Sequence, residues 1–68
     1  MEPIIIKCKI QPRRLVNEIW VTYDNGRVEI IGTYYPDEIS YTERAFYHLT
    51  RKEAKDMMTN RDKAYLQS

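Results

Sequence analysis

The first apolar run of the chain has the period of a β-strand. Residues 4–10 read IIIKCKI, and β-branched residues dominate the run. At a period of two, one face carries Ile4, Ile6, Cys8 and Ile10, and the other carries Ile5, Lys7 and Lys9. Pro12 ends the run because a proline has no N–H to donate to a neighbouring strand. We therefore expect a strand whose two lysines share the outer face with Ile5.

A β-hairpin centred on Asn25-Gly26 is the strongest local signal in the chain. This dipeptide favours a two-residue type I′ turn, and strand-like runs flank it over 17–24 and 27–35. The sequence therefore predicts two further strands joined by this turn.

The turn length decides which hairpin residues face the core. A two-residue loop sets Val21 opposite Ile30 and Trp20 opposite Ile31. The inner face then carries Ile19, Val21, Tyr23, Val28 and Ile30, and the outer face carries Glu18, Trp20, Thr22, Glu29, Ile31 and Thr33. A three-residue loop would set Val21 opposite Glu29 and bring charge onto the apolar face. We therefore predict the two-residue loop.

Residues 36–49 fit two interpretations. Ser40-x-x-Glu43 has the spacing of a capping box, which would start a short helix. Ile39 and Tyr41 could instead extend the sheet as a short fourth strand. Both interpretations stay open, as does a loop that covers part of the sheet.

The last segment predicts a helix from about residue 51 to about residue 66. Thr50 and Glu53 form a capping box, in which each residue bonds the backbone N–H of the other. The apolar stripe holds Ala54, Met57, Met58 and Tyr65, with Arg61 interrupting it and Ala64 and Leu66 at its margins. Lys52 and Asp56 form an i,i+4 pair on the solvent side. We expect the stripe to cover the Ile4/Val21/Ile30 face of the sheet.

These elements predict one small α+β domain over residues 1–68, a three-stranded antiparallel meander packed on one C-terminal helix, with a possible short fourth strand. A core of this size is thin, and such chains often gain stability from a disulfide, a metal or a partner. The chain has one Cys and one His, which excludes an intrachain disulfide and a zinc site with four N or S ligands. A partner is left, and we expect a homodimer.

Charge and segment composition bear on location and partners. Eleven Lys and Arg stand against ten Asp and Glu, a balance that argues against general phosphate binding. The N-terminus lacks the apolar run of an export signal, and no stretch is long enough to span a membrane. A lone thiol fits a reducing compartment, so we expect a cytoplasmic protein without membrane contact.

No motif in the sequence points to catalysis. Cys8 alternates with apolar residues and reads as a small buried hydrophobe, whereas a nucleophilic Cys needs a partly exposed, electropositive setting. His48 has no Ser, Cys or carboxylate placed relative to it by a motif, and Asp37, Glu38 and Glu43 lack cation-loop spacing. We therefore expect no enzyme, no cofactor and no metal.

The outer sheet face is the candidate binding surface. The predicted register places Trp20 and Ile31 there, and Ile5 and Tyr35 would join them. Aromatic residues dominate interface hot spots, and an exposed apolar group on a small sheet marks a contact surface. The leading hypothesis is thus a protein-interaction or regulatory module that self-associates through this face, and the alternative is that residues 36–49 cover it.

A second hypothesis uses the same face for nucleic acid. Lys7 and Lys9 lie on it, and Arg13 and Arg14 would lie nearby in a loop. Aromatic and basic side chains on a sheet surface hold single strands by stacking and charge. Against this, the predicted register puts two carboxylates, Glu18 and Glu29, on the same surface. The order of three strands and a helix also occurs in some modules that read the DNA major groove, which is a likeness of fold alone.

Overall fold

The computed structural model describes residues 2–67, with side chains over residues 2–63. The elements are β1 (Ile5–Pro12), β2 (Asn17–Tyr23), β3 (Val28–Tyr34), the 3-10 helix η1 (Glu43–Phe46) and α1 (Arg51–Gln67). The strands form an antiparallel sheet in the order β1-β2-β3. The predicted α+β fold is confirmed, and the described part of the chain forms no fourth strand.

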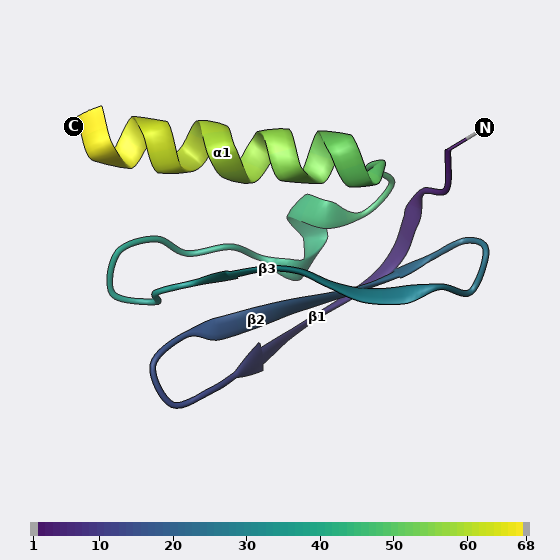
Figure 1. Cartoon of the computed structure of the whole chain (residues 1–68), viewed down its shortest axis with the longest axis horizontal. Helices are drawn as coiled ribbons and strands as arrows, with labels where there is room; N and C mark the ends of the chain where they lie inside the picture. The colour runs from purple at the N-terminus through teal and green to yellow at the C-terminus, as the bar shows by residue number, and fades with distance from the viewer. Residues whose placement is uncertain (1, 68) are drawn as a thin grey trace.

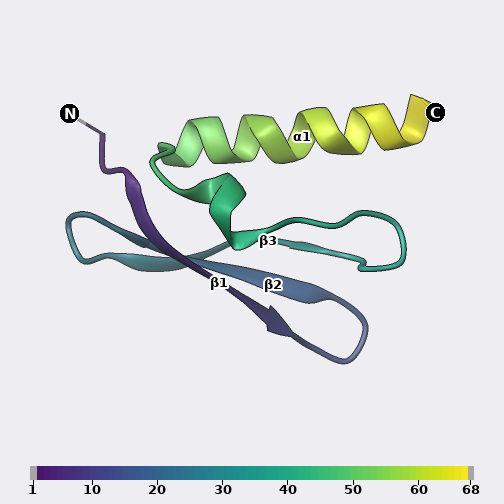
Figure 2. The ribbon, with the colours of Figure 1, turned by 180° about the vertical axis from the view of Figure 1, so that it is seen from behind.

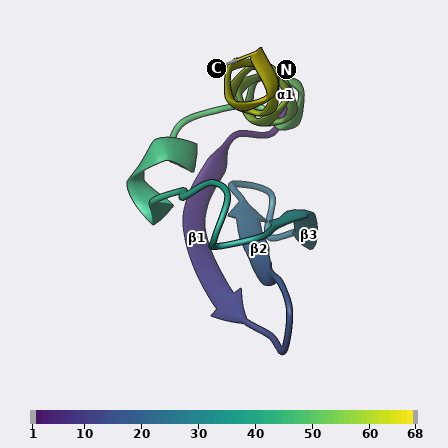
Figure 3. The same ribbon diagram turned by 90° about the vertical axis from the view of Figure 1, so that its left-hand side faces the viewer.

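Both helices lie on the same side of the sheet. Figure 1 shows α1 running above the strands, with η1 between the helix and the sheet, and Figure 2 shows the same layers from behind. Viewed from the end, α1 lies over the sheet and η1 sits beside β1 (Figure 3). The inner face is therefore covered, and neither helix reaches the outer face.

The core combines the sheet with residues from the connection between β3 and α1. Its largest fully buried side chains are Phe46, Ile5, Ile19 and Val21. The ring of Tyr41 meets Phe46 and also Tyr34, whose centroid is 5.1 Å away, and its hydroxyl donates to the carbonyl of Met58 at 3.2 Å. The connection thus fills the inner layer, which excludes the alternative that residues 36–49 cover the outer face.

The predicted alternation along β1 is wrong at its first residues. A bulge between Ile5 and Lys7 leaves Ile6 without a partner on β2. Ile5 is 0% exposed and Ile6 is 53% exposed, the reverse of the prediction. Ile5 is also fixed from the other edge, because its N–H donates to the carbonyl of Leu49 and its carbonyl accepts from the N–H of His48. A bulge of this kind shifts all residues before it to the opposite face.

The predicted two-residue turn is wrong as well. The N–H of Tyr23 donates to the carbonyl of Arg27 at 2.8 Å, so the loop has three residues. Gly26 ends this loop with φ +88°, a left-handed conformation that glycine adopts without steric cost. Val21 consequently lies opposite Glu29. This register was not expected, because it turns the charge of Glu29 toward the apolar face.

A second bulge restores the predicted pairing farther from the turn. The register shifts between Ile19 and Trp20, so that Trp20 lies opposite Ile30 while Ile19 lies opposite Gly32, as predicted. The extra residue, Ile31, turns into the core and is 3% exposed. Glu29 is tolerated on the inner side because the Tyr23 hydroxyl donates to it and Arg51 Nε lies 3.0 Å from its Oε1.

The predicted helix cap is confirmed. The N–H of Glu53 donates to Thr50 Oγ1 at 3.2 Å, and the N–H of Thr50 donates to Glu53 Oε1 at 2.9 Å. The Lys52–Asp56 pair also forms. The Arg61 guanidinium, which interrupts the predicted stripe, packs over the Tyr41 ring and donates to the carbonyl of Ser40. The remaining stripe positions, at Ala64, Tyr65 and Leu66, lie outside the described side chains.

Within residues 36–49 the chain forms a short helix, which was one of the predicted alternatives, but it lacks the predicted cap. The N-cap of η1 is Thr42, which makes no side-chain cap bond. Glu43 instead accepts a hydrogen bond from the backbone N–H of Ile10 at 3.0 Å. Ser40 and Glu43 therefore do not form a capping box, because the Glu43 carboxylate binds the backbone of β1 at its edge.

Candidate functional site

Two of the four predicted interface residues are not on the surface. Ile5 and Ile31 belong to the core for the reasons given above, so their assignment to the outer face is wrong. Trp20 is half-buried on the central strand, and Tyr35 is exposed just after β3. Trp20 is thus the one predicted contact residue that remains at the centre of the outer face.

The outer face is built from two rows of side chains that cross the three strands. Lys9, Trp20 and Ile30 are cross-strand neighbours, and so are Lys7, Thr22 and Val28. Side chains directly opposite one another in an antiparallel pair point to the same face and lie about 5 Å apart. The face therefore changes from basic at β1 to apolar at β3, with Trp20 between the two halves.

A shallow hollow of about 340 Å³ lies around Trp20. Its lining is Lys7, Lys9, Gln11, Arg13, Trp20, Thr22 and Val28. Three of these side chains are cationic, and Gln11 and Thr22 can donate and accept hydrogen bonds. The hollow combines an aromatic surface with positive charge and polar groups.

Glu18 connects Arg13 to Trp20 at the rim of this hollow. Its Oε1 accepts from Arg13 Nε at 2.8 Å and from Trp20 Nε1 at 3.2 Å. The bond from Arg13, followed by that from the indole, holds the pKa of the Glu18 carboxyl below its usual value. From the sequence, Glu18 was expected only to oppose an anionic ligand. Its spacing of two residues from Trp20 on one strand was the signal that the two side chains share a face.

The position of Glu29 on the inner side makes the charge of the outer face different from the predicted one. The predicted register put Glu18 and Glu29 together on this surface. In the structure Glu29 lies with Tyr23 and Arg51 on the helix side, and these contacts lower the pKa of its carboxyl, the Tyr23 hydroxyl most strongly. Of the two carboxylates expected to oppose Lys7 and Lys9, one remains.

The loop between β1 and β2 extends the basic side of the face. The N–H of Arg13 donates to the carbonyl of Val16 at 2.9 Å, which closes the loop. Arg14 is exposed within it but is not part of the lining of the hollow. Of the four predicted basic residues, the structure thus brings Lys7, Lys9 and Arg13 together around Trp20.

The two residues considered for catalysis lie in the core and in a turn. Cys8 is 5% exposed, and burial, with a smaller effect of the Glu43 charge, raises the pKa of its thiol to about 11. His48 is exposed and has φ 70° at the turn after η1. Among the described residues, no three metal-ligating side chains form a group, and no helix is long and apolar enough to cross a membrane.

No family model, curated protein or solved structure matches this chain.

Proposed function

We propose that the chain is a non-enzymatic nucleic-acid-binding protein and that the outer sheet face is its binding surface. The observation that carries this proposal is the position of Lys7, Lys9 and Arg13 around Trp20 on a face that neither helix covers. Basic side chains supply contacts to phosphates, and an aromatic ring on a sheet supplies a stacking platform.

The charge of the face favours an anionic ligand over a second copy of the chain. In a symmetric dimer the same face would be buried on both subunits. Lys7 and Lys9 would then meet the second copy of a face that carries one carboxylate, Glu18, already bonded to Arg13 and Trp20. Burying an ammonium group without a partner is unfavourable, whereas a phosphate backbone supplies a partner for each lysine.

The experiment is a binding titration with a fluorescent oligonucleotide at about 50 mM and about 200 mM salt, the range in which phosphate contacts weaken. The test variant is Lys7→Glu with Lys9→Glu. We expect the affinity for the oligonucleotide to fall as salt rises. We also expect the test variant to bind at least about tenfold more weakly than the wild type.

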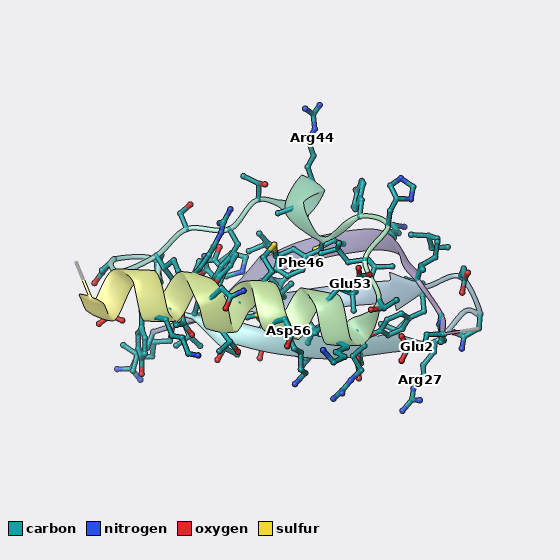
Figure 4. The ribbon with its side chains drawn as sticks, turned by 90° about the horizontal axis from the view of Figure 1, so that it is seen from above. Glu2, Arg27, Arg44, Phe46, Glu53 and Asp56 are labelled. Atoms are coloured by element: carbon teal, nitrogen blue, oxygen red, sulfur yellow. The ribbon has the colours of Figure 1, made fainter. Side chains whose placement is uncertain are left out.

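The matched control is Arg44→Glu with Lys55→Glu, which changes the net charge equally. Both residues are exposed on the helices, and Arg44 points away from the rest of the molecule (Figure 4). We expect this control to bind nearly as well as the wild type. Absence of binding at low salt, or an equal loss in the control, would overturn the proposal.

Self-association through the outer face is the second candidate function. It is favoured by the exposure of Val28 (53%) and Ile30 (44%), which form an apolar strip beside Trp20. Sedimentation equilibrium of the wild type and Trp20→Ser tests it. A dimer that becomes a monomer in the variant would support it, and a wild type that is monomeric at high micromolar concentration would exclude it.

We further propose that the protein acts in the cytoplasm. Cys8 supports this, because a buried thiol without a disulfide partner fits a reducing compartment.

A further inference from the structure

We infer that the ligand of the outer face is an unpaired strand and that one of its bases stacks on Trp20. This inference rests on the proposed function and assigns a base subsite within it. Its four supports are the placement of Trp20, the hydrogen bond that holds the indole, the size of the hollow and the position of the cations.

The indole of Trp20 is held in a defined orientation. Trp20 lies on the central strand, between Lys9 of β1 and Ile30 of β3. Its Nε1 donates to Glu18, and Glu18 is itself held by Arg13. A ring that is fixed before the ligand arrives loses little conformational entropy on binding, which favours stacking.

The hollow has the size and lining of a site for one planar group. Its volume of about 340 Å³ is at the lower end of ligand sites in proteins. Val28 and the indole supply apolar surface, while Gln11 and Thr22 can bond the polar edge of a base. A stacked base would thus meet both kinds of contact that it presents.

The cations lie along one side of this subsite. Lys7 and Lys9 are two residues apart on one face of β1, which separates their Cα atoms by about 6.5–7 Å. Arg13 lies beyond them, where β1 enters its loop. Its Nε is bonded to Glu18. A nucleic-acid strand that follows β1 would place its phosphates near Lys7 and Lys9 while one base reaches across to Trp20 on the adjacent strand.

A duplex does not offer the same contact. Its bases are stacked on one another and present only their edges in the grooves. An aromatic ring that is half-buried in a hollow cannot reach the face of a paired base without unstacking that base, which is energetically unfavourable. The Trp20 subsite therefore favours unpaired bases over a duplex of the same sequence.

Trp20 is the only tryptophan in the chain, so its fluorescence reports directly on this subsite. The full chain is titrated with three probes: a single-stranded oligonucleotide, the duplex of the same sequence, and an abasic strand of equal length. We expect quenching and the tightest binding with the single strand. The duplex and the abasic strand should bind at least about tenfold more weakly and quench less, because they supply phosphates without an accessible base.

The variant Trp20→Leu tests the stacking itself. We expect it to bind the single strand roughly 5- to 150-fold more weakly and to bind the abasic strand nearly unchanged. Tyr35→Leu is the control, because Tyr35 is an exposed aromatic residue that does not line the hollow. Circular dichroism of each variant shows whether it has kept the fold.

The outcomes separate the two proposals. If no nucleic acid binds, the proposed function fails. If the single strand, the duplex and the abasic strand bind equally well and Trp20 fluorescence stays constant, nucleic-acid binding stands and the base subsite is wrong. An equal loss in Trp20→Leu for the abasic strand and the single strand would also overturn the subsite.

Discussion

The carboxylate of Glu43 accepts a hydrogen bond from the backbone N–H of Ile10, with 3.0 Å between Oε2 and N. This bond joins η1 to the outer edge of β1. Farther along the same edge, the N–H and the carbonyl of Ile5 bond Leu49 and His48. Exposed strand edges pair readily with other chains, so these contacts close the edge of β1. They also bring a negative charge close enough to Cys8 to affect its thiol.

Stability should fall in alkaline solution, with Cys8 as one identifiable cause. Burial, followed by the Glu43 charge, raises the pKa of its thiol from 9.0 to about 11 in the folded state. Because the folded state binds this proton more tightly, the stabilisation is complete below pH 9 and is lost as pH rises toward 11. We expect the thiol to account for a loss of about 2 kcal/mol by a pH of about 10.5.

Urea unfolding of the wild type and Cys8→Ala at neutral and alkaline pH measures this contribution. The wild type should lose about 2 kcal/mol more than the variant on going from neutral pH to a pH of about 10.5. Burial also raises the pKa of Tyr23 and Tyr41, but both tyrosines remain in the variant and so cancel in the comparison. Equal losses in the two proteins would show that the thiol is not the titrating group.

Thr50→Ala should destabilise the protein by about 0.5–2 kcal/mol, the usual range for loss of an N-cap. The Thr50 hydroxyl accepts from the N–H of Glu53, and removing it leaves that donor without its partner in the helix. Thr42→Ala is the matched control, because Thr42 occupies the N-cap of η1 but makes no side-chain cap bond. The melting midpoints of the two variants should differ clearly, and equal midpoints would contradict the cap.

Two residues with positive φ should respond in opposite directions to substitution. His48 has φ 70°, a conformation that costs a residue with a Cβ roughly 1–2 kcal/mol. His48→Gly should therefore be neutral or stabilising, by up to about 1 kcal/mol after the entropy of the added glycine is subtracted. Gly26→Ala, at φ +88°, should destabilise by about 1 kcal/mol or more. Chemical denaturation of both variants checks this pair of predictions. Destabilisation by His48→Gly would show that the His48 side chain makes a stabilising contact.

Local rules predicted the elements of this fold but not its two bulges. The hairpin and the helix cap follow from residues close in sequence, such as Asn25-Gly26 and Thr50 with Glu53. The predicted register of the turn was wrong because it was chosen to keep the charge of Glu29 off the inner face. Arg51 makes that position acceptable, and it reaches Glu29 from a helix that begins 22 residues later. A contact at this sequence separation is invisible to a pattern argument.

The two bulges explain which part of the candidate site could be predicted. Trp20, Lys7 and Lys9 were placed correctly, because alternation is regular from Lys7 onward in β1 and along the whole of β2. Ile5 and Ile31 were misplaced because Ile5 precedes the bulge of β1 and Ile31 is the extra residue of the bulge in β3. The outer face was predicted to carry one carboxylate too many, because the predicted register put Glu29 on it. The proposal of nucleic-acid binding rests on this corrected position of Glu29.

Glu18→Gln should strengthen binding of a single strand and make it more sensitive to salt. Glutamine keeps an oxygen that can accept from the Trp20 indole, but it carries no charge to hold Arg13. Arg13 then becomes available to a phosphate. For single strands, the slope of log affinity against log salt is about −0.7 for each phosphate neutralised. Lys7 and Lys9 alone give about −1.4, and a third contact through Arg13 gives about −2.1.

Anisotropy titrations between about 50 and about 200 mM salt measure this slope. Glu38→Gln is the control, because Glu38 is an exposed residue beyond the end of β3 and its loss changes the net charge equally. The control should keep the wild-type slope, since the number of phosphate contacts counts and not the total charge of the protein. A slope that stays near −1.4 in Glu18→Gln, or that steepens equally in Glu38→Gln, would mean that Glu18 does not restrain Arg13 from the ligand.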